Sequence, residues 1–318
     1  MFRMNFNITF FNGKNTYTVT AVESIKIVDS VDSIISTAEI TLPSRPDEKL
    51  LLPGSKIDIF LWYDGFEPEK EFSGYVKECS DNGGKYTVLC ENEVYLLRKQ
   101  TCKNAVYNKI TCKDLLTEIL KDTSLKVDCD YDFDYDKFTI QNVSVYQVLK
   151  QLKSDVPCHI YLKDGVLHFH LPFTKDFGTA VYDTEVNIDR NGYALKFLTK
   201  DQRKLRVIYK GKTKDGKQIE SDVKGDPDGN IVTVEYKGVT TKECLNRMAE
   251  EYTEMKMFDG VEGSFTGWLY PVCRGGYRAE MRFCGQSERN GIYYVNSVEI
   301  QFDSSGAKRR VTLSKKLS

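Results

Sequence analysis

The stretches "YNKITCKDLLTEILKDTSLKVDCDYDF" (107–133) and "FTIQNVSVYQVLKQLKSDVPCHIYLKDGVLHFHL" (138–171) decide how this chain is divided. Each contains a short helical pattern that leads into β structure. The first pattern begins at Thr111 and has an aspartate three residues later, and the second begins at Ser144 and has a glutamine three residues later. Such pairs satisfy backbone N–H groups in the first turn of a helix. The sequence therefore predicts two capped helices.

Apolar residues recur at helical spacing inside both patterns. They are Leu115, Leu116, Ile119 and Leu120 in the first, and Val145, Val148, Leu149 and Leu152 in the second. The second helix is expected to end before Pro157, because proline interrupts a helix. A β-hairpin with its turn at Lys163-Asp164-Gly165 is predicted to follow. Residues 98–172 are therefore predicted to form a small α/β domain.

Strand patterns flank this domain on both sides. Residues 1–97 contain six strand-like runs separated by turn residues such as Pro53-Gly54. Residues 173–318 contain further strands and one amphipathic helix at about 241–257, for which Thr240 and Glu243 are the expected capping box. The predicted fold class is mainly β, with two small antiparallel β-barrel domains on either side of the α/β domain. We expect the two barrels to share one topology despite their unlike sequences.

The composition is that of a globular protein, with 41% hydrophobic and 29% charged residues. Nineteen Tyr and seventeen Phe against two Trp favour strands. No stretch approaches the roughly 20 apolar residues that span a bilayer, and the N-terminus lacks the pattern of an export signal. The nine cysteines are odd in number and include no C-x-x-C pair, so we expect reduced, mostly buried thiols and assembly in a reducing cytosol.

Charge is distributed unevenly along the chain. Residues 1–97 hold 9 Lys/Arg against 15 Asp/Glu, a net charge of −6. Residues 98–172 hold 11 against 10, and residues 173–318 hold 25 against 21, a net charge of +4. The overall charge of −1 gives no reason to expect specific binding of nucleic acid.

Five aspartates alternate with other residues at positions 128, 130, 132, 134 and 136. A calcium loop of the EF-hand type would need Gly and Glu at the positions that Phe133 and Thr139 occupy, so that motif fails. The run is interpreted as a strand with one acidic, solvated face. A cation site and a surface for a basic partner remain as alternatives.

The three histidines, His159, His168 and His170, all lie on the predicted hairpin. His168 and His170 are two residues apart, so they share a face of a strand, and His159 could approach across the turn. A metal site would need such clustering. Because no acid or cysteine of the hairpin completes the ligand set, a structural role is favoured.

Motifs that carry catalysis or bind nucleotides are absent from the sequence. The carboxylates Glu67 and Glu69 lie in a loop among like charges, and the basic residues 308–310 form too small a cluster for a nucleic-acid surface. The sequence therefore predicts no catalytic, cofactor-binding or metal-binding residues, no cofactor, and a protein that is not an enzyme.

The order of elements resembles a known family. A strand with "PG-x-x-I-x-I" is followed by "KDLLTEIL", then by "IQNVSVYQVLKQL" and "IYLKDGVLHF", and finally by "GIYYVNSVEI". This order is similar to that of the late control protein D family, the baseplate hub of contractile phage tails, which is related to the hub part of type VI secretion spike proteins. Asn142-Val143-Ser144 and the turn at Lys163-Asp164-Gly165 are the most telling matches.

The resemblance implies a homotrimer in which two barrels per subunit form a ring between the tail tube protein and the central spike. Because the sequence ends at Ser318, after the closing strand, the spike is expected to be a separate protein. Other baseplate proteins are further expected partners. The resemblance also implies synthesis in a bacterial cytoplasm and assembly into a virion, prophage or injection apparatus. The alternatives are a β-rich glycan-binding surface module and, with least support, a cell-wall hydrolase.

Overall fold

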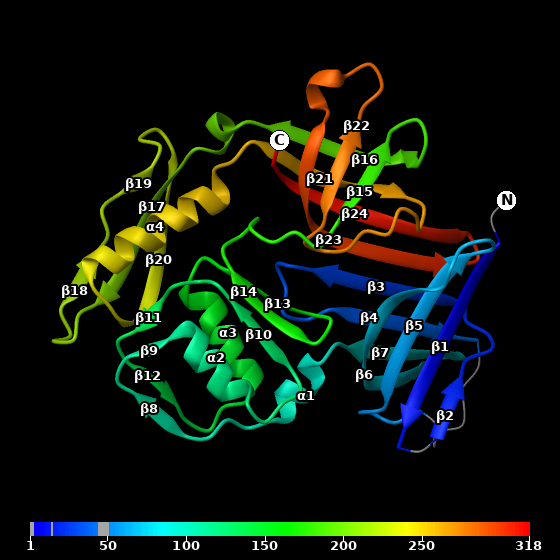
Figure 1. The fold of residues 1–318 in the computed structure, drawn as a ribbon, viewed down its shortest axis with the longest axis horizontal. Helices are drawn as coiled ribbons and strands as arrows, with labels where there is room; N and C mark the ends of the chain where they lie inside the picture. Colours follow the sequence, from blue (N-terminus) through cyan, green and yellow to red (C-terminus); the bar gives the residue numbers. More distant parts are fainter. Residues whose placement is uncertain (1–2, 14, 44–50) are drawn as a thin grey trace.

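The computed structural model describes residues 3–13, 15–43 and 51–318 of the chain. Strands from both ends of the chain meet in one 13-stranded sheet, and the helices gather beside it (Figure 1). The predicted class, mainly β with an α/β insert, is therefore confirmed. In the described residues, no helix is both long and apolar enough to traverse a lipid bilayer.

The first β region is built from strands whose apolar residues alternate with polar ones. In β5 the side chains of Ile57, Ile59 and Leu61 are buried on one face, as the alternation predicts. The strands of this region are β1 (Met4–Asn12), β2 (Asn15–Thr18), β3 (Ser24–Ser30), β4 (Thr37–Leu42), β5 (Lys56–Tyr63), β6 (Glu69–Asn82) and β7 (Lys85–Glu91).

The insert follows a short helix, α1 (Val94–Lys99), that the sequence did not predict. Both predicted helix caps are present, because Thr111 Oγ1 accepts a hydrogen bond from Asp114 N at 3.0 Å and Ser144 forms a complete capping box with Gln147. The other elements of the insert are β8 (Ala105–Tyr107), β9 (Ile110–Thr111), α2 (Cys112–Leu120), β10 (Lys126–Cys129), β11 (Asp134–Tyr135), β12 (Phe138–Ile140), α3 (Val145–Asp155), β13 (His159–Lys163) and β14 (Val166–His170).

The last part of the chain contains two sets of strands. The first set belongs to the large sheet: β15 (Thr179–Asp183), β16 (Ile188–Leu198), β21 (Gly260–Gly267), β22 (Arg278–Arg282), β23 (Gly291–Asp303) and β24 (Gly306–Lys316). The second set is a separate four-stranded sheet between β16 and β21: β17 (Leu205–Lys212), β18 (Gln218–Glu220), β19 (Lys224–Gly225) and β20 (Asn230–Val239), followed by α4 (Lys242–Lys256).

The predicted range 173–318 does not coincide with one hydrophobic core. Tyr209 of β17, Tyr236 of β20 and Met248 of α4 pack in the same buried cluster as the helices of the insert, and not with the large sheet. Periodicity shows which residues of a strand or helix are buried, but not which core receives them. The cap of α4 also lies one residue later than predicted, at Thr241, whose side chain accepts a hydrogen bond from Cys244 N.

One strand pair joins the two ends of the chain. β3 runs antiparallel to β23, with Ile27 opposite Ile300 and Ser24 opposite Asp303. Both isoleucines are buried in the core of the large sheet. The pairing makes the two β regions one continuous sheet, with β3 lying beside β23 (Figure 1).

The two β regions have the same strand order. The first runs β1-β5-β6-β7-β4-β3 and the second β15-β22-β23-β24-β21-β16. In both, the sheet order corresponds to the first, fourth, fifth, sixth, third and second of these strands along the chain. β2 is an addition to the first region, and the outer pair differs in direction, since β1 is antiparallel to β5 whereas β15 is parallel to β22. The predicted likeness of topology is confirmed in strand order, and closure of each region into a barrel stays a prediction.

A shared turn supports this equivalence. The N–H of Gly54 donates to Val76 O at 2.7 Å, and the N–H of Gly276 donates to Val295 O at 2.9 Å. In both regions the valine N–H donates in return to the carbonyl of the residue after the glycine. The φ angles of the two glycines are 96° and 82°, a backbone conformation that side chains disfavour. The same local geometry thus precedes the fourth strand of each region.

The capping box of α3 gives the first testable expectation. Ser144→Ala removes a side-chain acceptor at the start of the helix, so the free energy of unfolding should fall by about 1 kcal/mol. Ser154→Ala is the matched control, because the Ser154 hydroxyl only bonds the carbonyl of Gln151 in the last turn. Urea denaturation of both variants measures the difference. Equal stability of the two variants would contradict the role of the cap.

Candidate functional site

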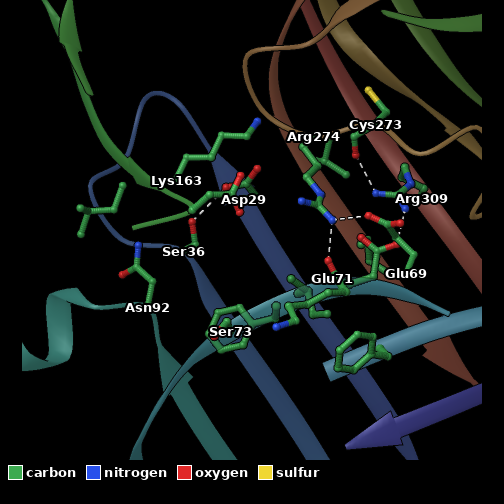
Figure 2. Close-up of a pocket in the computed structure, with 18 of the residues that line it drawn as sticks. Asp29, Ser36, Glu69, Glu71, Ser73, Asn92, Lys163, Cys273, Arg274 and Arg309 are labelled. Atoms are coloured by element: carbon green, nitrogen blue, oxygen red, sulfur yellow. Dashed lines mark hydrogen bonds and ion pairs between the residues drawn. The ribbon is translucent and has the colours of Figure 1, made fainter. Parts of the chain in front are cut away.

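A polar cavity lies where the three parts of the chain meet, and Figure 2 shows it in close-up. Its volume is about 390 Å³. Asp29 of β3 and Glu69 of β6 line it from the first β region, Lys163 enters from the insert, and Arg274 and Arg309 come from the second β region. Acidic and basic side chains therefore converge from segments that are far apart in the sequence.

A buried ion pair forms one wall of this cavity. Arg309 of β24 is fully buried, and its Nη2 lies 2.5 Å from Glu71 Oε1 of β6. The same guanidinium donates from Nε to Leu269 O at 3.1 Å and from Nη1 to Cys273 O at 2.6 Å. Arg309 thus holds the loop between β21 and β22 against the first β region, as the dashed lines in Figure 2 indicate.

A second arginine repeats the contact at the cavity mouth. Arg274 Nη2 lies 2.5 Å from Glu69 Oε1 and also donates to Lys70 O at 2.5 Å. On the other side of the loop, Asp29 Oδ2 accepts a hydrogen bond from Gly275 N at 3.0 Å. Charged groups from β3 and β6 therefore fix both sides of the loop.

The insert reaches the same loop through its hairpin turn. Lys163 Nζ donates to Gly275 O at 3.0 Å and lies over the rings of Phe177 and Tyr277, at 4.2 and 4.8 Å from their centroids. Burial lowers the pKa of Lys163 to about 8, so the ammonium form still predominates at neutral pH. The turn at Lys163-Asp164-Gly165, singled out in the sequence, is thus one of the points where the insert contacts the rest of the protein.

The polar side chains of the cavity connect the three parts of the chain to one another. The carboxylates Glu69 and Glu71 each form an ion pair with an arginine, Arg274 and Arg309 respectively. Cys273 is buried, and burial raises the pKa of its thiol to about 11, so it is protonated at neutral pH and not a nucleophile. These two carboxylates are thus engaged in ion pairs, and the thiol is not activated.

The three histidines lie together on β13 and β14, as predicted, and each has a protein partner. His159 Nε2 lies 3.1 Å from Asp32 Oδ1, and His168 Nδ1 lies 2.9 Å from Asp128 Oδ2. His170 Nδ1 lies 2.9 Å from the backbone oxygen of Leu171, so this nitrogen carries the proton and Nε2 accepts from the hydroxyl of Tyr161 at 2.9 Å. Within the described part of the chain, no group of three His, Cys, Asp or Glu residues is placed to hold a metal ion.

The aspartate run is not the single strand that the alternation predicted. β10 ends at Cys129, where it pairs with β14, and β11 begins at Asp134 and pairs with β9. Between them the chain crosses from one small sheet to another, because Tyr131 and Phe133 are drawn into the core beneath α4. The acidic side chains pair instead with lysines: Asp128 and Asp130 with Lys175, Asp134 with Lys109, and Asp136 with Lys214.

The basic residues 308–310 also differ from a surface cluster. They lie on one strand, so their side chains alternate, and Lys308 pairs with Asp189 while Arg309 points into the core. The role of Arg309 was missed from the sequence, although its position between the buried Ala307 and Val311 provided a signal. All nine cysteines have free thiols, and Cys284 is exposed.

No family model matches the sequence, and comparison with curated proteins finds no match either. Solved structures do match over nearly the whole chain. The tail protein from Neisseria meningitidis MC58 has 14% identity and a TM-score of 0.68, with 97% of this chain and 96% of that chain covered. The 43 kDa tail protein of prophage MuSo2 from Shewanella oneidensis has 13% identity and a TM-score of 0.67, with 98% of each chain covered.

A secretion protein shares the same fold. The E. coli c3393 protein, a component of the type VI secretion system described as similar in structure to the T4 phage tail proteins gp27 and gp5, has 9% identity and a TM-score of 0.59. The match covers 98% of this chain and 77% of that chain. The chain therefore has the fold of phage and prophage tail proteins, which confirms the predicted resemblance at the level of the fold.

The buried ion pair should be essential for stability. Arg309→Met leaves Glu71 without its cationic partner in the interior, so the free energy of unfolding should fall by about 3–5 kcal/mol. Arg310→Ala, one residue along on the exposed face, is the control and should change stability by no more than about 0.5 kcal/mol. The double variant Arg309→Met with Glu71→Met should recover most of the loss, because no buried charge then remains unpaired. A single variant as stable as the parent protein would contradict this role.

His170 should make stability depend on pH. Burial lowers its pKa to about 4, against an ordinary value of 6.5, so the unfolded chain binds a proton more readily than the folded protein between these limits. The parent protein should therefore lose stability relative to His170→Gln as the pH falls from 6.5 to 4. Urea denaturation of both proteins across this range measures the difference, in which the nearby groups His159, His168 and Lys175 are common to both. A difference that does not change with pH would contradict the expectation.

Proposed function

We propose that this protein is a structural component of a phage tail or phage-like contractile apparatus, and that it acts as the baseplate hub. Three copies form a ring that links the tail tube protein to a separate spike protein, in contact with other baseplate proteins. The chain is made in the bacterial cytoplasm and assembled into the tail from there. The likeness to tail proteins over almost the full length of the chain supports this role.

The repeated strand order is the observation that carries the proposal. A tail tube is a stack of rings. A hub that joins such a tube to a three-fold spike must match a ring of six units on one side and three-fold symmetry on the other. Two β regions of one topology in a chain give six similar units when three copies assemble. Such a trimer can present a ring of six units on one side and three-fold symmetry elsewhere.

The electrostatics of the chain support assembly in a ring. When three copies alternate their first and last β regions, each contact between copies joins a region of net −6 to one of net +4. Complementary charge mainly speeds encounter and fixes register, because exposed pairs are each worth only about 0–1 kcal/mol. The contact between isolated copies is therefore expected to be weak.

The two alternative functions have less support. A glycan-binding module would need aromatic rings open along a groove, yet the exposed Phe66 stacks on Tyr270 of the same chain at 4.4 Å. A hydrolase would need a proton-donating acid near a base. Two of the carboxylates that line the cavity, Glu69 and Glu71, are each held by an arginine.

The oligomeric state tests the proposal. We expect a monomer that converts to a trimer as the protein concentration rises, and that dissociates as salt approaches 1 M, where the Debye length shrinks to about 3 Å. Sedimentation velocity at several protein and salt concentrations measures both effects, and negative-stain electron microscopy of the trimer should show a ring. A dimer that is independent of concentration would overturn the hub geometry. A trimer that is indifferent to salt would keep the ring and remove the electrostatic contribution.

A further inference from the structure

The two β regions have the same strand order, so the pairing of β3 with β23 within the chain predicts where a second pairing of the same kind can form. We call the β3–β23 pair the filled junction and its equivalent the open junction. By their positions in the order, β3 is equivalent to β16, and β23 is equivalent to β6. β23 is long enough to pair with two strands along one edge. β22 pairs with its residues 291–294, and β3 pairs with Ser297–Asp303. In β6, β5 takes the corresponding first part, and no described strand lies along residues 77–81 on that side.

The other member of the second junction is also open. β16 pairs with β21 along one edge, and none of the described strands bonds its other edge. Its equivalent, β3, is bonded on both edges, to β4 and to β23. Each chain therefore has two strand edges that match each other, the outer edge of β16 in the second β region and the edge of β6 at residues 77–81 in the first. Open edges of this kind are ready to pair with another chain.

Side-chain exposure distinguishes the filled junction from the open one. Ile25 and Tyr193 are equivalent, because they face the equivalent buried residues Ile40 and Phe265 on the neighbouring strand. Ile25 is 1% exposed beneath β23, whereas Tyr193 is 37% exposed. Apolar surface that is covered in the first junction is thus left uncovered in the second.

The charges at the open edges are complementary as well. In the filled junction, Lys26 of β3 pairs with Glu299 of β23 at 3.1 Å. Ser80 is the equivalent of Glu299, since Val76 corresponds to Val295 and each strand has a bulge directly after its valine. Glu78 on β6 and Lys196 on β16 are both exposed.

We propose that β16 of one copy pairs antiparallel with residues 77–81 of β6 in a second copy, as β3 pairs with β23 within the chain. The register follows from the template, in which Val28 faces Glu299, so that Lys196 faces Ser80 of the neighbouring copy. Lys196 then lies diagonal to Glu78, within reach of its carboxylate. The contact joins unlike surfaces, so successive copies add head to tail and can close into a ring. That closure rests on the proposed hub function, whereas the choice of edges rests on the strand order.

Disulfide trapping in the full chain tests this register. The variant Lys196→Cys with Ser80→Cys is made in a Cys284→Ser background, which removes the exposed native thiol. Opposed residues of antiparallel strands have Cα atoms about 4.5–5.5 Å apart, within the range that a disulfide spans. Mild oxidation should give covalent dimers and trimers on a non-reducing denaturing gel, several-fold above the level that each single cysteine variant gives.

The chain provides a matched control for geometry. Val28→Cys with Glu299→Cys occupies the filled junction, so it should form a disulfide within one chain and give no higher-mass species. Sedimentation velocity of the unmodified protein is run in parallel. Trimers without cross-linking at 80 and 196 would overturn the edge pairing and leave the ring standing. A chain that stays monomeric at every concentration and does not cross-link would overturn the pairing and the ring together.

Discussion

The antiparallel pairing of β3 with β23 is the constraint on which the rest of the structure depends. It brings residues near 27 beside residues near 300, so everything between them must leave the sheet and return. The core beneath the pair is continuous, because Ile25 and Ile27 pack with Val298 and Ile300. A contact of such long range costs loop-closure entropy that only extensive apolar burial can offset. This explains why the largest core of the molecule lies under both β regions together.

Polar contacts around this seam specify how the parts are joined. Arg309, Arg274 and Asp29 all hold the loop between β21 and β22, and Lys163 attaches the insert to the same loop. A buried ion pair adds little net stability compared with an apolar pair of equal size, but its geometry penalises any other arrangement. We interpret the cavity between these side chains as the space left where three separately folded surfaces meet, and not as a binding site.

The sequence predicted local structure well and long-range structure in part. The caps at Thr111 and Ser144 were visible, because they depend on residues three apart. The sequence groups β17–β20 and α4 with the second β region, whereas in the structure they pack with the helices of the insert, because the apolar face of α4 fits either core. The sequence does not predict that Arg309 is buried in an ion pair, because its partner Glu71 lies 238 residues away in the sequence. Side chains whose role depends on a distant partner cannot be placed by a pattern of neighbours.

The two insertions share one core, and this arrangement leaves the sheet edges free. The α/β insert follows the last strand of the first β region, and the β17–β20 sheet with α4 interrupts the second between β16 and β21. Although 34 residues separate β14 from β17, Leu149 of α3 and Met248 of α4 lie in the same buried cluster. Each insertion therefore covers the apolar face of the other. Neither is needed to cover the outer edge of β16 or the second part of β6, so additions of this size can accumulate beside the repeated β units without closing the edges through which those units would join.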